Sequence, residues 1–125
     1  MTIIEAIDQI DSLKPNTYSA RQKILWLSQL EAIVKRQVID AHEGGEQVEF
    51  NGFDESTDVN TVLLIPSPFD ISYIYWLEAQ IHYYNGEMDR YNNAIILYKD
   101  LLEGFREYFH GSNKPLSRCG NRFRF

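Results

Sequence analysis

The sequence predicts an all-α protein, a small helical bundle in which a long antiparallel helical hairpin, about 70–109, packs on an N-terminal helix pair. Two observations carry this prediction. Apolar residues recur three or four positions apart in two long runs, which is the spacing of one helix face. Asn85-Gly86 separates the runs, and both residues tolerate the left-handed conformation common at helix ends. Helices joined by so short a turn fold back on each other. The apolar positions are 74, 77, 81 and 84 in the first run and Met88, Tyr91, Ile95, Tyr98, Leu102, Phe105 and Phe109 in the second.

Prolines mark the start of this hairpin. Pro66 and Pro68 disfavour the α conformation in the residues before them, so an extended segment is expected to end here. Asp70 follows, and we expect its carboxylate to cap the first hairpin helix by accepting hydrogen bonds from free amides. The second hairpin helix is predicted over about 87–109 and ends at the stretch 111–115, Gly-Ser-Asn-Lys-Pro.

Two further helices are predicted before the hairpin. The first is capped by Thr2 and ends at Lys14-Pro15. The second opens at Ser19, with Gln22 placed for a capping box, and runs to about Ala41 before Gly44-Gly45. Three cations, Lys23, Lys35 and Arg36, lie off its apolar stripe and are interpreted as a solvated face. The apolar faces are Ile3, Ile4, Ile7 and Ile10 in the first helix and Ile24, Leu27, Leu30, Val34 and Val38 in the second.

The segment between the helix pairs has a different character. Residues 43–62 form an acidic loop in which carboxylates alternate with apolar residues. Within 46–65 a short β-hairpin is a further prediction, because residues 47–52 alternate polar and apolar and Asn51-Gly52 suits a hairpin turn. The run 62–65, Val-Leu-Leu-Ile, is too short for a helix and is read as extended. So long a connection in a small domain is usually functional or mobile.

Composition bounds the class of protein. A chain of 125 residues with 44% hydrophobic residues forms one small globular domain, 1–110, followed by a basic and aromatic tail, 111–125. No apolar run approaches the roughly 20 residues of a membrane span. The acidic N-terminus lacks the basic start of a signal peptide. Cys119 is the only cysteine, which excludes an intramolecular disulfide and fits a reducing cytoplasm.

Charge is divided between body and tail. The tail carries four cationic side chains and no acid, so the net charge of −6 combines a tail of +4 with a body of −10. Such a division indicates different partners for the two parts, or tails that dock on the acidic bodies of neighbouring copies. An acidic body repels phosphate, so DNA is expected at most as the content of a channel, without sequence readout.

No catalytic signature is present. Glu78 and His82 lie one turn apart and could share a metal, but no further ligand stands at a suitable spacing, so a surface pair is the simpler reading. Cys119 has no neighbouring histidine to activate it. The acidic loop lacks the ligand order of a calcium-binding EF-hand. We therefore expect no enzymatic activity, cofactor, metal or small-molecule substrate.

Aromatic residues are denser than a two-helix core requires, which favours a protein–protein interface, where Tyr and Trp are enriched. Part of the acidic loop and the alternating cations and rings of the tail are further candidates for docking. The candidate interface residues are Tyr73, Trp76, Tyr83 and Tyr84 in the hairpin, Phe50, Phe53, Asp54 and Glu55 in the loop, and Arg118, Arg122, Phe123, Arg124 and Phe125 in the tail.

Several stretches together resemble a group of small proteins encoded in phages and prophages of Gram-positive bacteria. They cover nearly the whole chain and are specific to this group, although none is chemically diagnostic. They are 13–16 (LKPN), 23–31 (KI-x-WL-x-x-LE), 42–44 (HEG), 48–52 (VEFNG), 63–70 (LLIPSPFD), 73–81 (Y-x-YWLEAQI), 85–87 (NGE), 90–94 (RYNNA) and 122–125 (RFRF).

The resemblance implies a structural role in virion assembly. Such proteins look like head–tail connector proteins, also called adaptor or head-completion proteins. They are mostly helical and form a homo-oligomeric ring at the portal that joins head to tail. The implied partners are other copies of the chain and portal or connector proteins, and the implied locations are the virion and, during assembly, the host cytoplasm. The alternative is a helical protein-binding module, a phage-encoded regulator that grips a host protein through its aromatic face.

Overall fold

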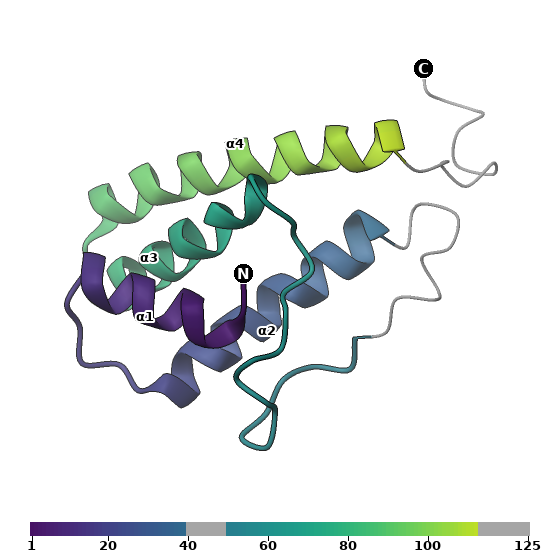
Figure 1. The fold of residues 1–125 in the computed structure, drawn as a ribbon. Helices are drawn as coiled ribbons and strands as arrows, with labels where there is room; N and C mark the ends of the chain where they lie inside the picture. Colours follow the sequence, from purple (N-terminus) through teal and green to yellow (C-terminus); the bar gives the residue numbers. More distant parts are fainter. Residues whose placement is uncertain (40–49, 113–125) are drawn as a thin grey trace.

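The structure is a computed structural model, and it describes residues 1–39 and 50–112. This part of the chain is helical, as predicted, with four α-helices and one short 3-10 helix. Figure 1 shows α4 lying along α3 on one side of the molecule, with α1 and α2 packed beneath the pair. In chain order the elements are α1 (Ile3–Leu13), α2 (Ala20–Gln37), the 3-10 helix η3 (Phe69–Ile71), α3 (Ser72–Tyr84) and α4 (Met88–Ser112).

The antiparallel hairpin is formed by α3 and α4, and they meet at the turn that the sequence predicts (Figure 1). Gly86 adopts a φ of +79°, in the left-handed region, and its amide donates to the carbonyl of Tyr83 at 3.1 Å. The amide of Glu87 then donates to the carbonyl of His82 at 2.9 Å, which closes the end of α3. The second helix of the hairpin, α4, is longer than predicted and ends at Ser112.

The start of α3 corrects one prediction, because Asp70 does not cap it. Asp70 lies inside η3, and α3 begins two residues later without any side-chain cap. The amide of Phe69 donates to the carbonyl of Pro66, and the amide of Ser72 donates to the carbonyls of η3. Since main-chain carbonyls take these amides, the Asp70 carboxylate turns instead to the amino group of Met1, at 3.5 Å.

The N-terminal helix α1 begins as predicted at a capping box. The hydroxyl of Thr2 accepts from the amide of Glu5 at 3.2 Å, and the Glu5 carboxylate accepts from the amide of Thr2 at 2.8 Å. Its buried face is Ile3, Ala6, Ile7 and Ile10, whereas Ile4, predicted to belong to this face, is only half-buried.

The second helix, α2, begins after Ser19, whose hydroxyl accepts from the amide of Gln22 at 3.1 Å. It ends at Gln37, a few residues before the predicted end near Ala41, and residues 40–49 lie outside the described part. Its predicted apolar stripe is buried throughout: Ile24, Leu27, Leu30, Val34 and Val38.

Lys23 was predicted to lie on a solvated face, and this is wrong. Its side chain is buried, and Nζ donates to Asp11 Oδ1 at 2.7 Å and to the carbonyl of Tyr18 at 2.9 Å. Packing α1 against α2 brings Asp11 to the ammonium, and the Tyr18 carbonyl just before α2 supplies the second acceptor, so the two compensate its loss of water. In the last turn of α2, Lys35 is half-buried and Arg36 is exposed.

The described part of the connection, 50–68, crosses the molecule as an extended strap and forms no strand pair, so the expected β-hairpin in 46–65 is not found among residues 50–65. Val62 instead makes a single antiparallel bridge to Thr2. The amides of Ile3 and Ile4 donate to strap carbonyls at 3.1 and 2.9 Å. Main-chain groups of the strap therefore hydrogen-bond to the start of α1 rather than to a partner strand.

The core lies where the four helices and the strap meet. Leu63 and Ile65 of the strap are buried in it together with the inner faces of the helices. On the hairpin these inner residues are Ile74, Leu77 and Ile81 from α3 and Tyr98, Leu102 and Phe105 from α4.

Candidate functional site

Four aromatic residues of the hairpin were predicted to form an interface, and the structure separates them. The interface prediction is wrong for Tyr73, because its side chain is fully buried and lies in the core, not on a surface. Trp76 is half-buried. Only Tyr83 and Tyr84, at the end of α3, are exposed, with 47% and 60% of their surface accessible. The reason is position along α3: Tyr73, in its first turn, is bound by Glu31 and the strap, whereas Tyr83 and Tyr84 lie in its last turn, beside the α3–α4 turn.

Trp76 acts mainly as a link between helices. Its indole Nε1 donates to the main-chain carbonyl of Trp26 in α2 at 2.8 Å. Its ring packs on Tyr98 of α4, with the ring centroids 5.1 Å apart. Trp76 therefore ties three helices together, and its half-buried ring has much of its area committed to the fold.

An aromatic pocket is formed by Tyr18, Gln22, Trp26 and Tyr84, which surround a hollow of about 170 Å³. The rings of Trp26 and Tyr84 are nearly parallel, with centroids 5.7 Å apart. Tyr18 meets Trp26 edge to face at 5.2 Å, and its hydroxyl donates to Asn85 Oδ1 at 2.7 Å. Sequence reasoning named Tyr84 but missed Tyr18 and Trp26, which α2 and the preceding loop bring to the end of α3.

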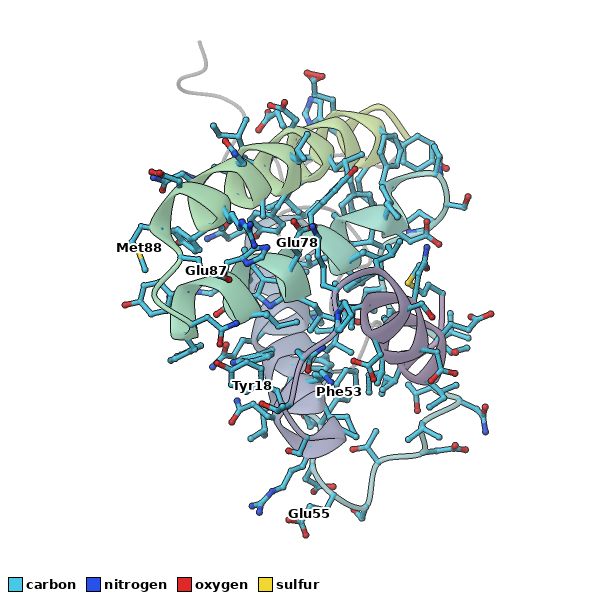
Figure 2. All side chains as sticks on the ribbon, turned by 90° about the vertical axis from the view of Figure 1, so that its left-hand side faces the viewer. Tyr18, Phe53, Glu55, Glu78, Glu87 and Met88 are labelled. Atoms are coloured by element: carbon cyan, nitrogen blue, oxygen red, sulfur yellow. The ribbon has the colours of Figure 1, made fainter. Side chains whose placement is uncertain are left out.

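Figure 2 looks onto this end of the molecule, where the α3–α4 turn lies. Tyr18, Glu87 and Met88 are all seen on it, whereas Glu55 lies at the far tip of the strap. Tyr83 extends the aromatic surface, with ring contacts to Tyr84 at 5.1 Å and to Tyr91 at 5.3 Å. Three exposed apolar side chains, Tyr83, Tyr84 and Met88, are called the hairpin end below.

The candidate interface residues of the acidic loop contact other parts of the same chain. Phe50 and Phe53 are half-buried and meet edge to face at 5.0 Å, and the amide of Phe53 donates to the Ser28 hydroxyl at 3.0 Å. Glu55 pairs with Arg21 at 2.8 Å, both side chains being exposed. These contacts hold the strap on α2.

Asp54 is exposed and organises the tip of the strap. Its carboxylate accepts from the hydroxyl and the amide of Ser56 at 2.6 and 2.8 Å. These hydrogen bonds, with those of Thr57, hold the pKa of Asp54 below its ordinary value. The carboxylate is thus engaged in a local turn.

The candidate residues of the tail, Arg118, Arg122, Phe123, Arg124 and Phe125, lie outside the described residues.

His82 departs from the predicted surface pair because it is buried, with 4% of its surface accessible. Its Nδ1 lies 2.8 Å from Glu87 Oε1, and its Nε2 lies 3.4 Å from Glu78 Oε2 without hydrogen-bond alignment. The hydrogen bond from His82 and the charge of Arg90 lower the pKa of Glu87. Within residues 1–39 and 50–112, no group of three or more His, Cys, Asp or Glu side chains is placed to hold a metal ion.

A buried carboxylate was missed from the sequence. Glu31 of α2 is 1% accessible, and its Oε2 accepts from the amide of Leu64 at 2.8 Å. The Tyr73 hydroxyl donates to Oε1 of the same carboxylate and accepts from the amide of Ile65 at 2.8 Å. Glu31 lies one turn from Leu27 and from Val34, so its place on the buried stripe was a readable signal.

Comparison with protein-family models, with curated proteins and with solved structures gives no match.

Among the helices of the described residues, none has both the length and the apolar character needed to cross a bilayer.

Proposed function

We propose that this protein is a structural component of a phage particle, a head–tail connector that assembles as a homo-oligomeric ring at the portal and joins head to tail. The resemblance of the sequence to such proteins motivates the proposal. The observation that carries it furthest is the apolar surface left open on the hairpin. Six of the ten large apolar side chains exposed in the described residues belong to α3 and α4: Tyr83, Tyr84, Met88, Ile96, Leu97 and Tyr108.

This surface has the character of a contact between proteins. Exposed Tyr, Ile and Leu side chains gathered on one helical hairpin suit a surface that a partner covers, because Tyr is enriched at the centre of interfaces. The exposed residues are spread along the hairpin from its turn to Tyr108, near the far end of α4. A subunit of a ring needs two separate contact patches, one for each neighbour, and exposed apolar residues both at the turn and along α4 are compatible with two such patches.

The proposed role is structural, without catalysis, a cofactor or a small-molecule substrate. The partners are other copies of the chain and portal or connector proteins, and the place of action is the virion, after assembly in the host cytoplasm. The acidic body would face DNA in the channel without gripping it, because carboxylates repel phosphate.

Light scattering behind a sizing column tests the proposal, over a wide concentration range and at low and high salt. The protein alone and the protein mixed with the portal protein of the same phage are compared, and large species are imaged by negative stain. A closed ring, formed alone or on the portal, supports the connector. A protein that neither self-associates nor binds the portal contradicts it.

A second candidate is a helical module that binds one host protein. The observation that favours it is the concentration of aromatic rings at the hairpin end and the aromatic pocket, a single compact site. Such a regulator would stay a monomer or dimer at every concentration and would leave the portal unbound.

A further inference from the structure

The aromatic pocket of Tyr18, Gln22, Trp26 and Tyr84 is preformed. Trp26 is 2% accessible, and its carbonyl is bound by the Trp76 indole, so this wall is fixed by the fold. The Tyr18 ring is held in place by the hydrogen bond from its hydroxyl to Asn85. Tyr84 forms the open wall, since its ring is largely exposed. A ligand would therefore find two rigid walls and one that can adjust, which limits the entropy lost on binding.

The size and lining of the pocket define the class of occupant. Its volume of about 170 Å³ is below the roughly 300–1,000 Å³ usual for small-molecule sites, so it suits one inserted side chain. Trp26 is only 2% accessible and its ring is stacked on Tyr84, so the rings open to an occupant are those of Tyr18 and Tyr84, whose faces bind other rings and guanidinium groups. Arginine and phenylalanine are thus the side chains best suited to it.

The C-terminal segment of the same chain offers both. Residues 122–125 read Arg-Phe-Arg-Phe, and residues 113–125 carry four cations and no acid, against a net charge of −10 on residues 1–110. The charges of segment and body are therefore complementary, which favours their encounter.

Geometry favours a second copy as the donor of this segment. The pocket includes Tyr84, the last residue of α3 before the turn, whereas α4 starts after that turn and ends at Ser112, so the length of α4 separates the pocket from Ser112. The 25 residues of α4 span about 37 Å. The 13 residues 113–125 reach at most about 47 Å when fully extended, and the ten residues to Arg122 about 36 Å. Only the last residues of its own segment could reach the pocket, and only along a nearly straight path back along the whole hairpin, whereas a neighbouring copy meets no such limit.

We propose that the segment Arg122–Phe125 of a second copy inserts an arginine or phenylalanine side chain into the aromatic pocket. The contact is heterologous, because the pocket of one copy meets the segment of the next, and repeated contacts of this kind close a ring. This inference rests on the proposed self-assembly and names the surfaces that mediate it.

Two full-length variants test the contact. Tyr84→Ala opens the pocket at an exposed side chain, and the quadruple variant R122A/F123A/R124A/F125A removes the segment chemistry. Each alone is expected to weaken self-association roughly tenfold or more in sedimentation measurements. Leu13→Ala, at an exposed apolar side chain of α1 outside the hairpin surface, is the control and is expected to retain wild-type association. All samples are kept reduced, because Cys119 lies near the segment.

Mixing the two defective variants gives the decisive result. A pair made of one intact pocket and one intact segment retains a single contact, so the mixture should form dimers and stop there. Equal association of wild type, Tyr84→Ala and the quadruple variant overturns the inference, although a ring formed by all three would leave the connector role standing.

A synthetic peptide of residues 113–125, titrated into the full-length protein while tryptophan fluorescence is followed, covers the case of a weakly associating wild type. Saturable binding is expected with the wild type, and loss of binding with Tyr84→Ala and with a peptide carrying alanine at 122–125. Absence of binding up to roughly 1 mM peptide overturns the inference, whatever the portal experiment shows.

Discussion

The hydroxyl of Tyr73 donates a hydrogen bond to the carboxylate of Glu31 in the interior of the protein, where α3 faces α2. Both side chains are almost completely buried, and both also hold the strap: Glu31 accepts from the amide of Leu64, and Tyr73 accepts from the amide of Ile65. One small polar network thus joins α2 to the strap and to α3, which both lie far from Glu31 in the sequence. Its removal should be costly because buried polar groups need partners.

Replacing Tyr73 with Phe should destabilise the protein by about 2–3 kcal/mol, because the buried amide of Ile65 loses its acceptor and Glu31 loses a donor. Urea unfolding followed by circular dichroism measures the change. Tyr83→Phe alters an exposed ring and should stay within about 0.5 kcal/mol of wild type. Equal stability of the two variants would contradict the structural role of the network.

The stability should depend on pH through Glu31. Burial raises the pKa of its carboxyl from 4.5 to about 7, although the hydrogen bonds from Tyr73 and Leu64 oppose the rise. Between these values the folded state binds more protons than the unfolded state. The free energy of unfolding should therefore fall by roughly 3 kcal/mol as pH rises from 4.5 to 7, and this contribution is constant above that range.

Glu31→Gln provides the comparison for this pH effect. Its stability relative to wild type, measured by urea unfolding between pH 5 and 8, should rise with pH, because only the wild type has a Glu31 proton to lose. The carboxylates with lowered pKa values, Glu5, Asp54 and Glu87, are shared by both proteins and change their contributions below pH 4.5. Parallel pH profiles would show that Glu31 does not titrate in this range.

The hairpin turn requires glycine at position 86. Its φ of +79° is unfavourable for a side chain, so Gly86→Ala should cost about 1 kcal/mol although the added methyl group meets open space. Gly111→Ala is the matched control, because position 111 also has open space but lies inside α4 without a left-handed φ. That variant should be neutral or slightly stabilising, through the higher helix propensity of alanine. Thermal unfolding distinguishes the two signs.

Substitutions of Lys23 and Arg21 compare the stability contributed by a buried charged contact with that of an exposed one. Lys23→Met removes two short hydrogen bonds from a buried ammonium, to Asp11 and to the Tyr18 carbonyl, and should destabilise the protein by about 1–3 kcal/mol. Arg21→Met breaks only the exposed pair with Glu55 and should cost less than about 1 kcal/mol. Similar costs in urea unfolding would mean that the Lys23 contacts are no stronger than a surface pair.

Much of the fold could be predicted because its signals are local. The helix faces, the Thr2 cap and the turn at Asn85-Gly86 all follow from residues within a few positions of one another. Asp70 does not cap α3 because nearby main-chain carbonyls take the first amides, while its carboxylate pairs with the amino group of Met1 from the far end of the sequence. Among residues 50–65 no strand pair forms, and main-chain groups of the strap bind the start of α1, a contact that no local pattern predicts.

The candidate site was predictable only in part. An excess of aromatic residues favours the prediction of an interface, but whether a given ring lies in the core or on the surface depends on what packs over it. Tyr73 and Tyr84 are both tyrosines of α3, yet one lies in the core and the other is mostly exposed. Trp26 and Tyr18 join Tyr84 only because α2 crosses the end of α3, a relation that no sequence spacing contains.

The sequence by itself determined the helical class, the hairpin and its turn, because periodicity and turn chemistry act within a few residues. The tertiary structure decided which polar groups are buried and which rings are exposed. Lys23 is paired inside with Asp11 of α1, and Glu31 with Tyr73 of α3, partners that the fold brings from other segments, whereas His82 meets Glu87 only five residues along the chain. A polar side chain enters the core when such partners compensate the loss of water, and that compensation is a property of the folded arrangement.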